Sequence, residues 1–476
     1  MVKRAFLVMA GTEVVSLLAF VYPFLSLPFL AVVGILAFLL AFRRAEWGAY
    51  LVFGELFFGS RGHLLEYNFG AVSLSLRLVV FVAVLLAWLL RTIRRPDALV
   101  RQISLLPGLY WALLLVVGVG VAAGLLKGHG LTEVFLDANN YLYFLIWLPV
   151  LAGLKDDGVK ENIFKILAAA IIIIAAKTFL LFLWFSGGFW GIATLYQWVI
   201  QQDIGEITGE VGSASRIFMQ SQFYALVGFF IFGLGAKPWG RNWWLVALSL
   251  LAVVMSLSRS FWLGALAGLA FAVPMLLFYY RVALREVAKL AGVLVLLIAV
   301  EVGAIYVLAN FRSVGFSSSV SSRLSSPVQE AAGSARLLLL PELLNRIRES
   351  PVFGQGFGTA VTYKSYLPDR ISPENPDGEV TTTAFEWGYL DIILKIGLLG
   401  FLVYALLLAR FFQQGWQSLK RAEPFDKNFG LLAGLVALAV LNITTPYLNH
   451  PLGIGYLLLL VAQFSGPLHP DSKEAL

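Results

Sequence analysis

Long apolar runs, separated by short polar segments, repeat from one end of the chain to the other. About 20 apolar residues in a helix cross the roughly 30 Å hydrocarbon core of a bilayer, and most of these runs approach that length. We expect spans near residues 5–22, 24–42, 48–60, 72–92, 104–125, 139–154, 163–186, 222–236, 242–257, 260–280, 289–310, 386–411, 428–443 and 451–467. The pattern predicts an all-α polytopic integral membrane protein with about 12–14 transmembrane helices. We treat residues 1–476 as a single transmembrane domain.

The composition excludes a soluble protein of this length. Of 476 residues, 59% are hydrophobic and only 13% are charged, which is too little polar material to cover the surface of one soluble domain. Cysteine is absent, and this excludes disulfides, thiolate metal sites and a cysteine nucleophile.

The net charge of +7 would suggest a nucleic-acid partner only if the basic residues formed one patch. They cluster instead in short loops between the expected spans, at 43–44, 91–101, 155–165, 237–241, 281–289 and 420–427. These loops and the termini hold about 21 of the 35 Lys and Arg residues, a bias that marks the cytoplasmic side of a membrane. We therefore expect both termini in the cytoplasm, contacts with membrane lipids, and no nucleic-acid partner.

Two segments on the opposite, outer side are longer than simple connections. Residues 187–221 form a medial outer loop, and residues 311–385 form a large outer loop. Loops of that length usually have internal order and a function. Within the large loop, 337–347 has the pattern of an amphipathic helix, and we expect Pro341 to begin a new helix at its first turn.

Arginines collect at or just outside the outer ends of the expected helices. They are Arg216 in "GSASRIFMQSQF", Arg259 in "SLSRSFW" and Arg336 in "GSARLLLLPELL". Arginine stays charged and offers a fork of donors that matches phosphate oxygens, so a converging set would suit a diphosphate. The alternative is that each arginine extends to lipid headgroups. Arg323, in the same large loop, is a further candidate for substrate binding.

Glu386 lies where the large loop enters the next span, in "TTTAFEWGYL". Thr383, three residues earlier, would form a capping box with it at the start of a helix. The functional alternative makes this carboxylate a general base that removes a proton from an attacking hydroxyl. The two roles are compatible, because the positive end of a helix also stabilises a carboxylate.

Other polar residues allow more than one interpretation. Asp203, Glu206 and Glu210 would share a face of a helix, where they are either solvated or in contact with sugar hydroxyls. The run "GQGFGT" lacks the Lys-Ser/Thr that completes a phosphate loop. The histidines have no metal-ligand spacing, so we expect neither a metal site nor a cofactor, and His450 is expected to be structural.

Four charged residues fall inside expected spans, where an isolated charge is costly. They are Glu55, Lys177, Glu301 and Lys395. Such residues either pair with one another or line a transport path, and both alternatives remain open at this point.

Residues 210–465 resemble the O-antigen ligase and polymerase superfamily (the WaaL and Wzy type, with its carboxy-terminal Wzy signature). The resemblance rests on four features in order: the arginine of "SRIFMQSQF", the segment "SRSFWLGALAGL", the stretch "GSARLLLLPELLNRIRESPVFGQGFGT" and the segment "FEWGYLDIILKIGLLG". The last is similar to the family pattern "HNxYLxxLxxxGLxG" and contains Tyr389, a candidate substrate contact. Where the family usually has His-Asn, this chain has Glu386-Trp387.

The resemblance implies an inner-membrane glycosyltransferase of the GT-C type with its active site on the outer face. Such enzymes take a polyprenyl-diphosphate-linked glycan as donor, use neither metal nor nucleotide sugar, and invert the anomeric carbon. Arg216 and Arg336, with Arg259, would hold the diphosphate, and Glu386 would be the base unless Glu379 takes that role. The acceptor would be a lipid A core sugar in a ligase or another lipid-linked repeat in a polymerase. The large loop favours a polymerase slightly. The alternative from another class is a transporter or flippase of a lipid-linked glycan or small anion.

Overall fold

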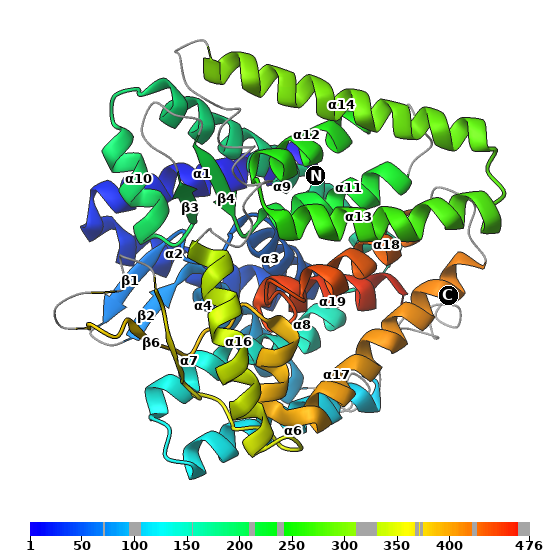
Figure 1. Cartoon of the computed structure of the whole chain (residues 1–476). Helices are drawn as coiled ribbons and strands as arrows, with labels where there is room; N and C mark the ends of the chain where they lie inside the picture. Colours follow the sequence, from blue (N-terminus) through cyan, green and yellow to red (C-terminus); the bar gives the residue numbers. More distant parts are fainter. Residues whose placement is uncertain are drawn as a thin grey trace.

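The computed structural model describes residues 1–69, 72–94, 106–154, 156–208, 215–235, 242–310, 331–366, 371, 375–420 and 426–464. Helices dominate these residues (Figure 1). In the first half they are α1 (Val2–Val21), α2 (Ser26–Arg43), α3 (Ala45–Phe58), α4 (Leu76–Ile93), α6 (Gly108–Leu126), α7 (Leu131–Leu142), α8 (Trp147–Gly153), α9 (Asp157–Gly187) and α10 (Ile192–Gln201). In the second half they are α11 (Gln222–Leu234), α12 (Trp243–Met255), α13 (Arg259–Pro274), α14 (Leu284–Asn310), α16 (Ala331–Glu349), α17 (Gly388–Leu419), α18 (Lys427–Leu441) and α19 (Pro451–Phe464).

The helices confirm the predicted fold class. Among the described residues, nine helical segments are long and apolar enough to cross a membrane, and α11, α12, α18 and α19 are shorter apolar helices. Several boundaries differ from those expected: α9 begins at Asp157 rather than 163, α14 begins at Leu284 rather than 289, and α17 ends at Leu419 rather than 411. The fourth span begins at Leu76 rather than 72, because 72–75 form a strand. The sixth begins earlier, at Leu131, and a 3-10 turn at Tyr143–Ile146 divides it into α7 and α8.

The short apolar helices form the centre of the bundle. Every residue of α11 is buried, and so are most residues of α18 and α19. A helix that is apolar on all sides is stable only inside a protein or a membrane. Small residues bring these backbones together: a Cβ added to Gly430 of α18 would overlap Phe230 in α11. In contrast, α14 lies along one edge of the bundle and is largely exposed (Figure 1).

Three antiparallel hairpins lie in the connecting segments. They pair β1 (Glu66–Phe69) with β2 (Val72–Ser75), β3 (Gly205–Thr208) with β4 (Arg216–Met219), and β5 (Val361–Lys364) with β6 (Glu379–Thr382). The helical face expected for Asp203, Glu206 and Glu210 is therefore wrong. Asp203 is in a turn and Glu206 is in β3, where exposed Glu206 alternates with buried Ile207; Glu210 is outside the described residues.

Helix α16 is continuous through Pro341, so the new helix expected to begin there is also wrong. Proline inside a helix leaves the carbonyl four residues earlier without its usual donor. That carbonyl belongs to Leu337, which is 48% exposed, and an exposed carbonyl can be solvated instead. The helix therefore tolerates the proline.

Helix α17 is broken at Gly397, and the segment after α16 fills the break. Gly397 has φ 71°, which favours glycine, and a Cβ there would overlap the Val352 carbonyl. On one side of the break the amide of Gln355 donates to the Leu394 carbonyl (2.6 Å). On the other side the amide of Leu399 donates to the Val352 carbonyl (3.1 Å). The first part of α17 is thus attached to the large outer segment.

The run "GQGFGT" continues from this break to α6 and α7. The Phe357 amide donates to the Gly120 carbonyl (3.1 Å), and the Gly358 amide donates to Asp137 Oδ2 (2.9 Å). Gly124 permits this approach, because a Cβ there would overlap the Phe357 carbonyl. The amides of this run therefore bond to protein acceptors and join three elements.

Candidate functional site

A cavity of about 570 Å³ lies among seven segments that are separate in the sequence. Each segment belongs to a connection, or a helix end next to a connection, that the charge pattern places on the outer side. The cationic residues that line the cavity are Arg61, Arg216, Arg336 and Lys395. The carboxylates that line it are Glu133, Asp137, Glu206, Glu386 and Asp391. The lining of the cavity thus carries charges of both signs and is not purely basic.

Three of the candidate residues line this cavity: Arg216, Arg336 and Glu386. The lining residues in the described part of the chain do not include Arg259, Glu379 or Tyr389. These three are respectively the first residue of α13, an exposed residue of β6, and a residue of α17 whose hydroxyl donates to the Ala439 carbonyl (2.6 Å). Arg323 lies outside the described residues.

Arg336 and Glu386 form an ion pair between α16 and the residues that precede α17. Nε of Arg336 donates to Oε2 of Glu386, and the Trp387 indole donates to the Arg336 carbonyl (3.0 Å). The capping box expected for Glu386 is not formed, because α17 begins at Gly388 with Trp387 as its N-cap and no side-chain cap. The carboxylate is therefore directed to the arginine, and its side chain remains 50% exposed.

Arg216 belongs to a second set of charges on the other side of the cavity. Its Nε donates to the Ser256 carbonyl (2.9 Å), its Nη1 lies 3.4 Å from Glu206 Oε2, and its guanidinium lies over the Phe218 ring at 4.7 Å. Arg61 reaches the same carboxylate at 3.9 Å. Sequence reasoning missed Arg61, which lies in the connection between α3 and β1.

A third group contains buried charges that the sequence did not associate with a site. Nζ of Lys395 donates to Asp137 Oδ1 and lies 2.6 Å from Asp391 Oδ1, while the Asn449 amide donates to Asp391 Oδ2. The i,i+4 spacing of Asp391 and Lys395 on one helix is a signal that predicts their pairing. No local signal indicates Asp137 or Asn449, because each comes from another helix or connection.

His450 also lines the cavity, at the start of α19. Burial, together with the positive charges of Arg77 and Arg61, holds the pKa of His450 well below its ordinary value. Its Nδ1 accepts a bond from the Leu452 amide (3.3 Å). The imidazole is therefore neutral and weakly basic, which suits a structural role better than that of a proton acceptor.

Most of the intramembrane charges have partners in the bundle. Glu55 pairs with Arg77 (2.9 Å), Lys177 pairs with Glu13 (2.5 Å), and Lys395 pairs with the aspartates described above. Glu301 in α14 has one carboxylate oxygen, Oε2, without a hydrogen-bond partner among the described residues. For three of the four charges, pairing offsets the free-energy cost of burial, so a transport role is not needed to explain them.

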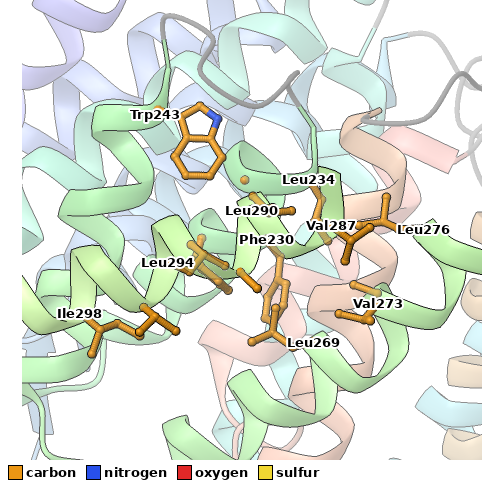
Figure 2. Close-up of a pocket in the computed structure, with 15 residues that line it drawn as sticks. Phe230, Leu234, Trp243, Leu269, Val273, Leu276, Val287, Leu290, Leu294 and Ile298 are labelled. Atoms are coloured by element: carbon orange, nitrogen blue, oxygen red, sulfur yellow. The ribbon is translucent and has the colours of Figure 1, made fainter. Parts of the chain in front are cut away.

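A second, apolar pocket of about 220 Å³ lies between α14 and the helices α11, α12 and α13. Figure 2 shows Phe230 and Leu294 directed into it, with Trp243 at one end and Ile298 nearer the other. In the described part of the chain, the residues that line the pocket are glycine and apolar side chains, apart from the indole of Trp243. Such a pocket suits a hydrocarbon chain.

Comparison with known proteins finds one family. Residues 244–405 match the family model described as O-antigen ligase, and no curated protein matches the chain. The matched residues include Arg336, Glu386, Asp391 and Lys395, whereas Arg216 lies before them. The chain therefore carries, over residues 244–405, a domain of the O-antigen ligase family, which confirms its resemblance to the O-antigen ligase and polymerase superfamily.

Proposed function

We propose that the protein is an inverting glycosyltransferase of the GT-C type, which transfers or polymerises glycan from a polyprenyl-diphosphate-linked donor on the outer face of the cytoplasmic membrane. The observation that carries this proposal is one cavity lined by Arg216, Arg336 and Glu386, within a chain whose residues 244–405 match the O-antigen ligase family. The reaction needs neither a metal nor a nucleotide sugar.

The two arginines hold the diphosphate by exchanging partners. In the structure each of them faces a carboxylate that is 50% exposed: Arg336 faces Glu386 and Arg216 faces Glu206. Exposed ion pairs contribute only about 0–1 kcal/mol, so a diphosphate with more charge and a matching fork geometry displaces them. Binding of the donor would then also release Glu386 from Arg336.

Glu386 removes the proton from the acceptor hydroxyl as that oxygen attacks the anomeric carbon. The new glycosidic bond forms while the bond between the anomeric carbon and the diphosphate oxygen breaks. Negative charge grows on the leaving diphosphate, where the arginines stabilise it, and this type of stabilisation is usually the largest contribution to catalysis. Glu379 is less suited, because it is an exposed residue of β6 outside the cavity lining.

The lipid part of the donor needs an apolar surface, and the pocket beside α14 offers one. Its lining residues belong to α11–α14 and to the turn Met275–Tyr279 that follows α13. Helix α13 connects the two sites: Ser260 at its start lines the cavity, and Val273 near its end lines the apolar pocket. A long polyprenyl chain can follow this helix from one site to the other.

The proposed orientation has both termini in the cytoplasm and the cavity outside. Tyr366, in the segment proposed to be outside, is 74% exposed, and the Arg285 side chain, in a loop proposed to be cytoplasmic, is 81% exposed. The native chain has no cysteine. We expect Tyr366→Cys to react with an impermeant thiol reagent in spheroplasts, and Arg285→Cys to react only after lysis. The reverse labelling pattern would show that the orientation is wrong.

The decisive experiment incubates the purified full-length protein with a polyprenyl-diphosphate glycan and an acceptor, in EDTA and without nucleotide or ion gradient. We expect new glycosidic bonds, detected by mass spectrometry of the product. Movement of intact donor across proteoliposomes with no new bond would instead favour a flippase. The same assay with two different acceptors separates the two enzyme types: transfer to a lipid A core sugar indicates a ligase, and transfer to a second lipid-linked repeat indicates a polymerase.

A further inference from the structure

The wall of the cavity differs chemically from one part to another. Arg61, Arg216 and Arg336 supply positive charge, but a separate part, the second side, has two carboxylates, Asp137 and Asp391, around Lys395. An excess of carboxylate repels a diphosphate. The second side therefore needs a ligand that is neutral and rich in hydrogen-bond donors.

Buried polar atoms on this second side lack partners. Asp391 is 3% exposed, Asn449 is 7% exposed and Tyr141 is 1% exposed, and all three line the cavity. Within the described part of the chain, Asn449 Oδ1 and the Tyr141 hydroxyl have no hydrogen-bond partner, while Asp391 Oδ1 lies 2.6 Å from Lys395 Nζ. Buried polar groups in native proteins are nearly always hydrogen-bonded, so two unpartnered atoms beside a buried carboxylate in one cavity wall point to a ligand.

The type of these atoms indicates what the ligand presents. The Asn449 oxygen is an acceptor, as is the neighbouring Asp391 carboxylate, and the tyrosine hydroxyl both donates and accepts. Adjacent hydroxyls of a pyranose also donate and accept, whereas a phosphate at neutral pH mainly accepts. We propose that Tyr141, Asp391 and Asn449 form a subsite for the acceptor sugar, the ring whose hydroxyl attacks. This inference rests on the proposed function.

The position of the subsite agrees with this role. Asp391 is in the first turn of α17, where its amide donates to the Trp387 carbonyl (2.8 Å), and Glu386 directly precedes Trp387. Lys395 lies 5.6 Å from the centroid of the Phe385 ring. The contacts of Lys395 with Asp137 and of Asp137 with the Gly358 amide hold this turn against α7. A sugar bound here would lie beside the proposed base.

Tyr141→Phe tests the subsite in the full-length protein in nanodiscs. The probes are methyl glucoside, methyl galactoside, methyl mannoside and methyl N-acetylglucosaminide, titrated by saturation-transfer NMR. We expect at least one to bind saturably, and the variant to raise its Kd by roughly 5–10-fold through loss of one hydrogen bond. A purely structural role predicts no change in Kd, because the hydroxyl has no partner among the described residues. Tm should stay the same or rise.

Tyr110→Phe is the matched control, because the Tyr110 hydroxyl is buried but donates to the Phe144 carbonyl (3.0 Å). It should lower Tm and leave the Kd of the glycoside unchanged. The subsite is refuted if no glycoside binds saturably, or if Tyr141→Phe binds as tightly as the wild type.

Two further measurements separate this inference from the proposed function. Arg336→Ala should lose binding of inorganic diphosphate and keep that of the glycoside. If the glycoside results hold but no transfer occurs, the subsite stands and the glycosyltransferase proposal fails. In the transfer assay, Tyr141→Phe should raise KM for the acceptor and leave KM for the donor within about twofold; the opposite pattern would overturn the assignment to the acceptor.

Discussion

Arg336→Ala should reduce transfer by roughly 100–1000-fold, the usual effect of removing one group that stabilises transition-state charge. The guanidinium lines the cavity, and among the described residues its ion-pair partner is the half-exposed carboxylate of Glu386, so the fold should survive its loss. The measurement is the single-turnover rate with saturating acceptor, together with the yield of monodisperse protein. Because the guanidinium both binds the diphosphate and stabilises the charge that grows on it as it leaves, the loss should appear in kcat as well as in KM for the donor.

Two companion variants make this result specific. Arg348→Ala removes an arginine from the same helix whose side chain, among the described residues, donates to nearby Asn345, and it should keep nearly full activity. Arg336→Lys keeps the charge but loses the bidentate fork, so it should rescue poorly. If Arg336→Lys is almost fully active with the donor limiting, the diphosphate clamp is mistaken and anchoring to lipid headgroups is preferred.

Glu386→Gln should lower the transfer rate by roughly 100-fold or more, the usual scale of general base catalysis. Glutamine keeps the size of the side chain, and α17 has no side-chain cap to lose. A structural role through the Arg336 contact therefore predicts little change in rate. The measurement is kcat across a pH series. If Glu386 is the catalytic base, its replacement should also abolish the fall in kcat at acidic pH, because that fall reports protonation of the carboxylate.

The first control for this prediction uses the position at which the chain has Glu386 where the resembled family pattern has histidine. Glu386→His restores the residue type of the resembled motif and a group that accepts a proton near neutral pH, so partial activity is expected. Glu379→Gln changes an exposed carboxylate of β6 and should have little effect. An inactive Glu379→Gln beside a nearly normal Glu386→Gln would reassign the base to Glu379.

The spans could be predicted because hydrophobic length is a property of a continuous segment, and crossing a bilayer requires little else. Each of the fourteen expected spans, as at 5–22 or 428–443, overlaps a helix in the described part of the chain. Rules based on a few neighbouring residues, such as those for capping boxes and for proline at the start of a helix, predicted less well where residues remote in the sequence also make contacts. Thr383 and Glu386 form no capping box because α17 begins only at Gly388, and Arg336, fifty residues away, bonds the carboxylate instead. Pro341 begins no helix because α16 already runs through it from Ala331 to Glu349.

By itself, then, the sequence determined that the protein is a helical membrane protein and that several arginines lie at the expected outer ends of helices. It also showed that its motifs resemble those of the O-antigen ligase and polymerase superfamily. Only the tertiary structure decided which of these arginines share a cavity, and it added Arg61, Asp137 and Asn449 to Arg216 and Arg336. The physical reason is that the packing of helices depends on complementary shapes and small residues on segments remote from one another. Neither hydrophobic period nor charge count specifies which helices meet.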